Sequence, residues 1–302
     1  MRSVKLLLPL LILVISGCAP NSGAPISTTS SAPSQLAPSN GDIVIPAERP
    51  DAVFVPAGQF IMGDDNGLTD ERPAHPVTLD AFWIDRTEVT NSMYAQCMDA
   101  GACQTPASTV YYDDPAYSDH PVAFVSWVDA KNFCAWAGKR LPTEAEWEKA
   151  ATWNSKTNIK SVYPWGNDFD CRKGNFDDEN QVDASLMPNT EIGCDGFVRT
   201  APVGSFPDGA SSYGALDMAG NVWEWVHDAF IEVDPFNSSI QNYYAISEPT
   251  NPQGVDPAIT EYRSMRGGSW NFTFGFGRSA YRLWYGKDDV YDGVGFRCAQ
   301  TP

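Results

Sequence analysis

The stretch Gly138-Lys139-Arg140-Leu141-Pro142-Thr143-Glu144-Ala145-Glu146-Trp147-Glu148 carries the most structural information in this chain. Thr143 followed three residues later by Glu146 is a capping box, in which each side chain accepts a hydrogen bond from the backbone amide of the other residue. The spacing predicts a helix that begins just after Thr143, with Trp147 packed into a core. Gly138 stands where a preceding helix would end, because a left-handed glycine often closes a helix. The stretch therefore predicts two successive helices.

Two helices are predicted upstream of this stretch, the second of them being the one that Gly138 closes. Ser126 followed by Asp129 is another capping box, and apolar residues recur on one face behind it. Thr90 begins the earlier helix, again with apolar residues at helical spacing. Lys139 and Arg140 come just after a helix end, where the helix dipole favours positive charge. We therefore interpret both charges as structural.

Short β-rich runs precede these helices. Two of them, within residues 53–63, flank Pro56-Ala57-Gly58 and predict a hairpin that turns at this tripeptide. Another pair of runs follows at 77–79 and 82–85. Beyond Ala151 the chain becomes rich in Gly, Asn, Asp and Pro with scattered aromatic residues. So long a stretch without periodicity is unusual in one compact domain, and we expect bound ions and disulfides to order these loops.

The composition excludes several classes of function. Among 302 residues, 20 Lys and Arg stand against 38 Asp and Glu, which gives a net charge of -18. A field of this sign repels phosphate backbones, so we expect no nucleic-acid partner, whereas hard cations such as calcium are favoured. Ten Trp, twelve Tyr and fifteen Phe supply ample bulk for a packed core. Neither a glycine-rich phosphate loop nor a Ser-His-Asp arrangement is visible in the sequence.

Residues 1–18 are predicted to be a lipoprotein signal peptide. A basic start is followed by an apolar run at 6–15 that is too short to span a bilayer comfortably. Ile15-Ser16-Gly17-Cys18 then resembles the lipobox of bacterial lipoproteins, and this resemblance implies cleavage before Cys18 and a diacylglycerol on its thiol. The alternative is an ordinary secretory signal with an incidental cysteine. We expect an extracytoplasmic protein anchored by lipid to the bacterial cell membrane or outer membrane; Ala19 lacks the charge of the usual inner-membrane retention signal.

Residues 19–50 are predicted to form a flexible Ser/Pro/Thr-rich tether, because so few bulky apolar groups cannot offset the entropy cost of ordering. A single globular domain then spans 51–302. This domain contains six cysteines: Cys97, Cys103, Cys134, Cys171, Cys194 and Cys298. Export permits disulfides, but six cysteines allow many pairings and the sequence does not choose among them. Buried free thiols are the alternative.

Eight motifs give the domain a resemblance to a known family. In chain order they are Phe60-Ile61-Met62-Gly63, Glu88-Val89-Thr90-Asn91, His120-Pro121-Val122, the stretch 137–148, Tyr163-Pro164-Trp165-Gly166, Thr200-Ala201-Pro202-Val203-Gly204, Gly220-Asn221-Val222-Trp223-Glu224-Trp225 and Arg266-Gly267-Gly268-Ser269. Together they resemble the formylglycine-generating enzymes, also called sulfatase-modifying factors. The resemblance covers nearly the whole exported domain. It implies one α+β domain with little regular secondary structure, related to C-type lectin folds.

The resemblance implies one disulfide, between Cys134 and Cys298, which would tie a helix to the C-terminus. With that pair assigned, we predict two further bridges: Cys97–Cys103 at a helix end and Cys171–Cys194 across the remaining loop. On this assignment no cysteine of the domain is left for catalysis.

The resemblance also implies two structural calcium sites. The first maps onto Asn175, the carbonyl of Phe176, Asp195 and the carbonyl of Phe197. The second maps onto Asp217, the carbonyls of Gly220 and Val222, and Glu224. These are oxygen ligands of the kind that calcium takes. Solvated loop acids, with Asn221 in an Asx turn, are the alternative.

The expected catalytic centre departs from the family. The family keeps two cysteines between Trp270 and Phe296 that hold Cu(I) and engage a substrate cysteine, whereas this chain has none there. Ser269 and Trp270 match the start of the active-site strand, but Phe272 takes the place of the first cysteine. Residues 273–278 replace the region of the second, with a short deletion. Copper and oxygen-dependent formylglycine formation are therefore not expected.

A surface rich in aromatic and basic residues remains in this region. Its members are Trp270, Phe272, Phe274, Phe276, Tyr281, Trp284 and Tyr285, with Arg278, Arg282 and Lys287 among them. Aromatic residues with arginine are typical of binding hot spots, so peptide or glycan is the expected ligand. The alternative is that at least half of the rings are core, with Arg278 and Arg282 paired to acids.

Three functions stay open at this point. The first is a calcium-stabilised, lipid-anchored binding or accessory module, expected to be a monomer. The second is a formylglycine-generating oxidoreductase that acts on a cysteine of exported sulfatases. The third is a variable ligand-binding protein of the diversity-generating-retroelement type, with variation confined to 270–295. An iron site like that of the sulfoxide synthases that share this domain is not expected from His75, His120 and His227, because those enzymes take their histidines from an additional helical domain.

Overall fold

The computed structural model describes residues 49–177, 193–231, 243–256 and 258–302. All of these belong to the unit that spans Ile43–Pro302. The predicted signal peptide, Cys18 and nearly all of the predicted tether lie outside the described residues. None of the helices in the described residues has both the length and the hydrophobicity that a bilayer-spanning helix needs.

The first four strands form one long antiparallel pair. β1 (Ala52–Val55) pairs with β4 (Phe82–Asp85), and β2 (Gly58–Met62) pairs with β3 (His75–Leu79) in the same register. The predicted hairpin at Pro56-Ala57-Gly58 is therefore wrong, because the chain reverses at residues 63–74. Proline has no N–H for the ladder and so interrupts a strand; here it interrupts one strand without reversing it. β11 (Ala299–Gln300) adds to the free edge of β4.

A second sheet of four strands supports the C-terminal half. Its order is β10-β7-β8-β9, in which only the β10–β7 pair is parallel. The strands are β7 (Trp223–Ala229), β8 (Tyr262–Arg266), β9 (Leu283–Gly286) and β10 (Val294–Gly295). A short two-stranded ribbon, β5 (Trp153–Asn154) with β6 (Ile159–Lys160), follows the third helix.

The predicted helices are confirmed, together with their caps. They are α1 (Asn91–Asp99), α2 (Trp127–Trp136) and α3 (Glu144–Thr152); a short α4 (Tyr243–Ile246) was not predicted. Both capping boxes are present, and Gly138 closes α2 with a φ of 71°. Single turns of 3-10 helix occur at Thr69–Glu71, Pro115–Tyr117, Cys171–Lys173, Pro207–Gly209 and Phe274–Gly277.

Lys139 and Arg140 follow the end of α2, and each is paired with a carboxylate of a neighbouring element. Lys139 Nζ lies 2.6 Å from an Asp85 carboxylate oxygen, and the Arg140 guanidinium donates to both oxygens of Glu146 at 2.6 and 2.7 Å. These partners lie on β4 and α3. The two charges therefore tie the end of α2 to its neighbours.

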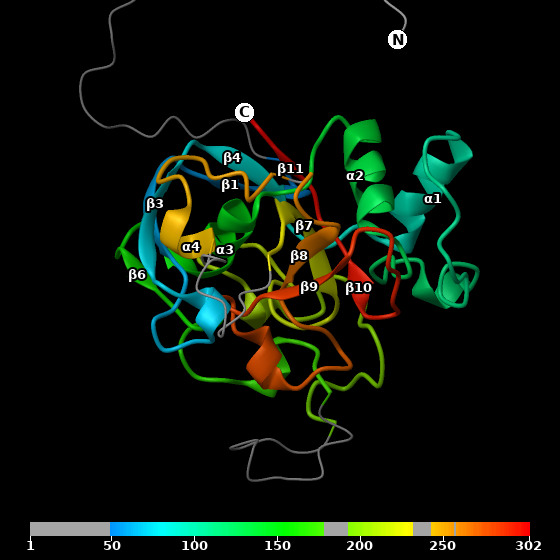
Figure 1. Cartoon of the computed structure of the whole chain (residues 1–302). Coiled ribbons are helices and arrows are strands. Elements are labelled where there is room, and N and C mark those ends of the chain that lie inside the picture. Colours follow the sequence, from blue (N-terminus) through cyan, green and yellow to red (C-terminus); the bar gives the residue numbers. More distant parts are fainter. Residues whose placement is uncertain (1–48, 178–192, 232–242, 257) are drawn as a thin grey trace, which may run out of the picture. The chain divides into compact units, whose positions relative to one another are not determined.

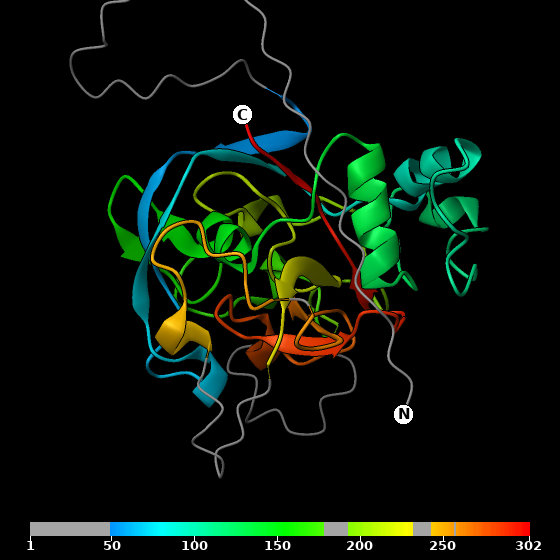
Figure 2. The same ribbon diagram turned by 45° about the horizontal axis from the view of Figure 1, so that its top comes forward.

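The core lies around α3. Figures 1 and 2 show α1 and α2 together on one flank of the molecule, whereas α3 lies among the strands. Trp147 on α3 is fully buried, as predicted, and packs in a cluster with residues of the first strands. A second cluster joins α1 and α2 to β7 and the C-terminus. Every residue of α3 is buried, which makes this helix the centre of the domain.

All three predicted disulfides are present. Cys134 joins Cys298 with a Cα–Cα distance of 5.6 Å and ties α2 to the C-terminus. The other two bridges are Cys97–Cys103 and Cys171–Cys194. The six cysteines of the domain are therefore all paired, and none carries a free thiol.

Candidate functional site

The segment after β8 occupies the region in which the resemblance places the catalytic cysteines. Gly267 and Gly268 have φ angles of 101° and 80°, in the left-handed region that favours glycine. A Cβ atom on Gly268 would lie 3.1 Å from the Gly277 backbone. These glycines turn the chain out of the sheet, so Ser269 and Trp270 lie in a loop rather than at the start of a strand, which corrects the prediction.

Phe272, at the position of the first family cysteine, belongs to a cluster of rings. Its ring centre lies 5.6 Å from that of Trp223 and 5.1 Å from that of Phe276, both in edge contact. Tyr281 closes the cluster, 4.9 Å from Phe276 and 6.0 Å from Trp223. Such edge contacts are favourable beyond the burial of area alone. The place of the expected thiol is therefore filled by an aromatic side chain that packs on the sheet.

The aromatic residues singled out in the sequence are neither core nor freely exposed. Trp270, Phe272, Phe274, Phe276, Tyr281, Trp284 and Tyr285 are all half-buried. Ser269 is fully buried, and its hydroxyl donates to the Asn271 side-chain oxygen at 2.6 Å. Each of these aromatic side chains is therefore partly covered by the domain and partly open to solvent.

The two arginines of this region pair with acids, which was the alternative prediction. Arg278 donates to both carboxylate oxygens of Glu71 at 2.8 and 2.7 Å. Arg282 does the same with Glu144 at 2.7 and 2.8 Å, and this pair is buried. Bidentate pairs fix the guanidinium plane. Arg282 is therefore part of the framework, whereas Arg278 remains partly exposed.

The first predicted calcium site is assembled around an amide oxygen without a partner. Asn175 is fully buried; its nitrogen donates to a backbone carbonyl and to Asn221, but its Oδ1 accepts no hydrogen bond. The Asp195 carboxylate accepts the backbone N–H groups of Phe176 and Phe197 at 3.0 and 2.8 Å. The four residues thus lie together, and a buried acceptor of this kind fits an oxygen-seeking cation.

The second predicted site is less open to a cation. Glu224 is buried, and its two oxygens accept from Arg297 at 2.6 Å each, with Trp147 donating to one of them at 2.8 Å. Asp217 has one oxygen that accepts the Gly204 N–H at 2.6 Å, while its Oδ1 is buried and accepts no hydrogen bond. Of the two predicted side-chain ligands, only Asp217 has an oxygen without a partner.

The two predicted sites adjoin one another. A Cβ atom on Gly220 would lie 2.3 Å from the Asn175 carbonyl oxygen, so only glycine fits there. The next residue, Asn221, donates its backbone N–H to the same carbonyl at 2.8 Å. Val222 is fully buried just before β7. A loop with close backbone contacts therefore joins the two ligand sets.

Sequence reasoning missed Glu88 as a member of this region. It is almost fully buried, its Oε1 accepts from the Asn221 side chain at 3.1 Å, and its Oε2 accepts no hydrogen bond. Burial and the neighbouring Asp217 raise the pKa of Glu88 well above its usual value. Burial also raises the pKa of Asp217. The motif that contains Glu88 was the available signal, but nothing in it shows that the carboxylate is left without a donor.

The histidines do not gather into a site. His120 contacts the Thr200 hydroxyl at 3.0 Å, His75 contacts Ser247 at 2.9 Å, and His227 lies on β7. Across residues 49–177, 193–231, 243–256 and 258–302, no three side chains of His, Cys, Asp or Glu converge to hold a metal ion. Any cation in the described part of the chain would therefore need further ligands besides these side chains, such as backbone, amide or water oxygens.

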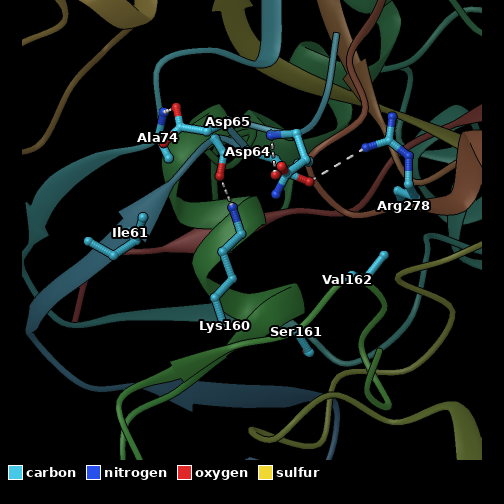
Figure 3. Close-up of a pocket in the computed structure, with 11 residues that line it drawn as sticks. Ile61, Asp64, Asp65, Ala74, Lys160, Ser161, Val162 and Arg278 are labelled. Atoms are coloured by element: carbon cyan, nitrogen blue, oxygen red, sulfur yellow. Dashed lines mark hydrogen bonds and ion pairs between the residues drawn. The ribbon is translucent and has the colours of Figure 1, made fainter. Parts of the chain in front are cut away.

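A pocket of about 330 Å³ lies beside the segment that follows β8, and Arg278 of that segment lines it (Figure 3). It opens between the 63–74 loop, Lys160 and Arg278. In Figure 3, Arg278 reaches toward Asp64, at 3.9 Å, and Lys160 points toward the same loop. Lys160 is paired at 2.7 Å with the buried Glu148. Lys160 and Arg278 are balanced by Glu148 and Glu71. The carboxylates of Asp64 and Asp65 therefore give the pocket a net negative charge.

The chain is similar to several known proteins. Hercynine oxygenase of Mycolicibacterium smegmatis is 33% identical over 278 residues, which cover 80% of this chain and 60% of that protein. The mouse protein named inactive C-alpha-formylglycine-generating enzyme 2 is 30% identical over 303 residues, covering 84% of this chain and 87% of its own. The structure of PvdO from Pseudomonas aeruginosa matches with a TM-score of 0.63 at 28% identity, over 83% of this chain and 94% of its own.

The chain spans 37% to 60% of the length of the Mycolicibacterium smegmatis protein and of four other relatives. Residues 43–302 match the family model described as the sulfatase-modifying factor enzyme 1-like domain. The fold is that of the formylglycine-generating enzymes and is related to C-type lectins. The motif order, the architecture and this match agree, so the chain belongs to the sulfatase-modifying factor enzyme 1-like family.

Proposed function

We propose that this protein is an exported, lipid-anchored and calcium-stabilised member of the family that binds a ligand and does not form formylglycine. The observation that carries the proposal is the packing of Phe272 at the position of the first catalytic cysteine. All six cysteines of the domain are also in disulfides. Cu(I) selects thiolate ligands, and this domain offers none. The similarity to a mouse relative named as inactive is consistent with a non-catalytic role.

Calcium is proposed as a structural ion. Asn175 Oδ1 and Asp217 Oδ1 are buried oxygens without hydrogen bonds, and both belong to predicted ligand sets. At the first site Asn175 and Asp195 would hold the ion with the carbonyls of Phe176 and Phe197. At the second, Asp217 would act with the carbonyls of Gly220 and Val222 and with Glu224. The bidentate pair of Glu224 with Arg297 makes the second set the weaker fit.

A peptide with a basic side chain is the proposed ligand. The pocket in Figure 3 borders the substituted segment through Arg278, and its excess charge is negative at Asp64 and Asp65. A cationic side chain would complement these carboxylates, and the half-buried rings nearby supply apolar contact area. Glycan is the other ligand class predicted from the sequence.

The decisive experiment tests whether the domain oxidises a substrate cysteine. The purified domain would be titrated with Cu(I) and given a peptide that contains the Cys-x-Pro-x-Arg motif of sulfatases. We expect no oxygen consumption and no aldehyde in the peptide. Oxygen uptake with aldehyde formation would establish the alternative function, a formylglycine-generating oxidoreductase, and overturn the proposal.

The lipid anchor is tested separately. We expect radiolabelled fatty acid to enter the full-length protein in bacterial cells and Cys18→Ser to abolish the label. The variant should then leave the membrane fraction. Labelling that persists in Cys18→Ser would contradict lipidation at this residue. The three disulfides are consistent with an oxidising compartment.

A further inference from the structure

Lys149 on α3 is a buried cation that has no carboxylate partner among the described residues. Its side chain is 1% exposed, and its Nζ donates to the carbonyls of Pro56 and Gly58, each at 2.8 Å. No ion pair in the described part of the chain includes this residue. Burial lowers the pKa of Lys149 to about 8. A buried charge without a counter-ion is costly, and an ammonium has three donors, so one donor and one positive charge remain unmatched.

Lys149 borders a pocket of about 610 Å³ whose charge differs from that of the whole chain. Among the residues that the structure describes, the only charged ones that line it are Lys149 and the exposed Lys156. None of the described Asp and Glu residues lines this pocket, although the whole chain has 38 acids and 20 Lys and Arg. It shares no lining residue with the Asp64 pocket. A local positive field within an acidic protein favours an anion at this place.

The remaining lining combines rings with neutral hydrogen-bonding groups. Trp153 and the half-buried Tyr213 supply aromatic surface. Gln59, Asn158 and Ser155 are exposed at the rim and offer amide and hydroxyl groups. Apolar ring surface with a few convergent polar groups is the usual composition of a small-ligand site. Neutral amides and hydroxyls are suited to a ligand that is rich in hydroxyl groups.

We propose that this pocket binds a sugar ring that bears a carboxylate, as in the uronic acids of acidic polysaccharides. The carboxylate would pair with the exposed ammonium of Lys156 and lie within the field of the buried Lys149. The sugar hydroxyls would meet the amides and hydroxyls of the rim, and the apolar face of the ring would lie on the aromatic side chains. A singly charged carboxylate matches one accessible ammonium better than a phosphate dianion, which needs more donors. The proposal goes beyond the proposed function, since it depends neither on calcium nor on the substituted catalytic segment.

Lys149 also has a structural role, because its two hydrogen bonds hold the interruption between β1 and β2. A change at Lys149 alone would therefore mix stability with binding. Lys156 is exposed and makes no ion pair among the described residues. A substitution of Lys156 therefore tests the effect of the pocket's positive charge on binding without a loss of stability. Lys131 is exposed on α2 and does not line the pocket, which makes it a matched control for net charge.

The test is isothermal titration with a galacturonate oligosaccharide, with a neutral galactose oligosaccharide and free acetate as comparison ligands. We expect the acidic sugar to bind at least about ten-fold more tightly than either, a difference of about 1.4 kcal/mol. Lys156→Gln should weaken binding several-fold, Tyr213→Ala should weaken it also, and Lys131→Gln should leave it unchanged. Lys149→Met should abolish the preference for the acidic sugar, with a melting curve to establish that this variant is folded.

Three results would overturn the proposal. One is equal affinity for the acidic and neutral sugars, and another is equal affinity for acetate, which would indicate an anion site only. The third is the absence of binding at concentrations up to about 1 mM, the range of weak specific ligands. If Lys149→Met does not fold, Lys156→Gln and Tyr213→Ala decide the outcome, and full binding in both would contradict the site.

Discussion

Two buried clusters of charge in this domain are built in opposite ways. In the α3 cluster, Glu144 and Glu148 pair with three cations, which are Lys160, Arg266 and Arg282. Each of the four carboxylate oxygens in this cluster accepts at least one hydrogen bond. In the Asp217 cluster, three carboxyl groups meet one guanidinium, and one oxygen of Glu88 and one of Asp217 have no donor except each other's carboxyl group. The members of this cluster are Glu88, Asp217, Glu224 and Arg297.

The difference indicates which buried carboxylates are balanced by the chain itself and which would gain from a bound cation. A buried carboxylate is tolerated when it is paired and hydrogen-bonded, and is costly when it is not. The carboxylates of the α3 cluster meet this condition within the chain, although the Nε of Arg266 has no acceptor among the described residues. The Asp217 cluster does not, and it lies where the family resemblance places a cation. This contrast is the physical support for calcium.

Breaking the balanced cluster should have the largest effect. Arg266→Met removes a fully buried guanidinium that pairs with Glu144 and Glu148 at 3.0 and 2.5 Å. We expect a loss of about 3–5 kcal/mol in the free energy of unfolding, because buried carboxylates lose their partner. The control is Arg172→Met, which breaks an exposed pair with Asp170 and should cost no more than about 1 kcal/mol. Similar losses in urea unfolding for the two variants would contradict this account of the framework.

The pH dependence of stability should report the same cluster. Burial alone would raise the pKa of Glu148, but Lys160 and Arg266 outweigh burial and lower this pKa from 4.5 to about 2. A depressed pKa adds stability that is fully present above the unfolded value and is lost as the pH falls through the folded one. We therefore expect stability to decline between pH 4.5 and about 2, by about 3 kcal/mol from this group.

Urea midpoints measured across this range would check the decline. Glu148→Gln should be less stable at neutral pH and should flatten the acid limb, because it has no charge to lose. An acid limb as steep in Glu148→Gln as in the natural protein would show that another group carries the effect.

The local elements of this fold could be predicted because their signals are local. The capping boxes at Ser126 and Thr143 need only residues three positions apart, and both formed as expected. The hairpin at Pro56 was predicted wrongly, because a proline signals an interrupted ladder but does not tell a reversal from a kink. Only the pairing with β3 and β4, set by tertiary packing, decides between them.

The candidate site was predictable only in part, for the same reason. The resemblance assigned Asn175 and Asp217 to ligand sets, and the structure leaves one oxygen of each without a hydrogen bond. Glu88 was missed because its partner Asn221 is 133 positions away in the chain. The pairing of Arg278 with Glu71, 207 positions apart, was open for the same reason. Charge balance in a core depends on such distant neighbours.

Calcium removal is the next test of the contrast, with a smaller expected effect. A ligand that binds only the folded state at one hundred times its dissociation constant adds about 2.7 kcal/mol. We expect a chelator to lower the urea midpoint by this order and calcium to restore it. Asn175→Ala, which removes the oxygen without a partner, should reduce the response. A midpoint that is insensitive to chelator and calcium would remove calcium from the proposal.

The smallest effect, and the sharpest contrast, should come from neutralising Glu88. Glu88→Gln keeps the shape of the side chain, removes one of three buried carboxyl groups and adds an amide donor beside Asp217. In calcium-free buffer we expect this variant to be more stable than the natural protein by about 1–2 kcal/mol, since a buried acceptor gains a donor. Its gain from added calcium should be smaller.

Glu148→Gln is the matched comparison, because the same chemical change in the balanced cluster should destabilise. Opposite signs for the two variants in urea unfolding without calcium would establish that the clusters differ in charge balance and not merely in position. A loss of stability in Glu88→Gln as large as that in Glu148→Gln would mean that Glu88 has a cationic partner in the folded protein. The Asp217 cluster would then be complete without an added ion, and the physical argument for calcium there would fail.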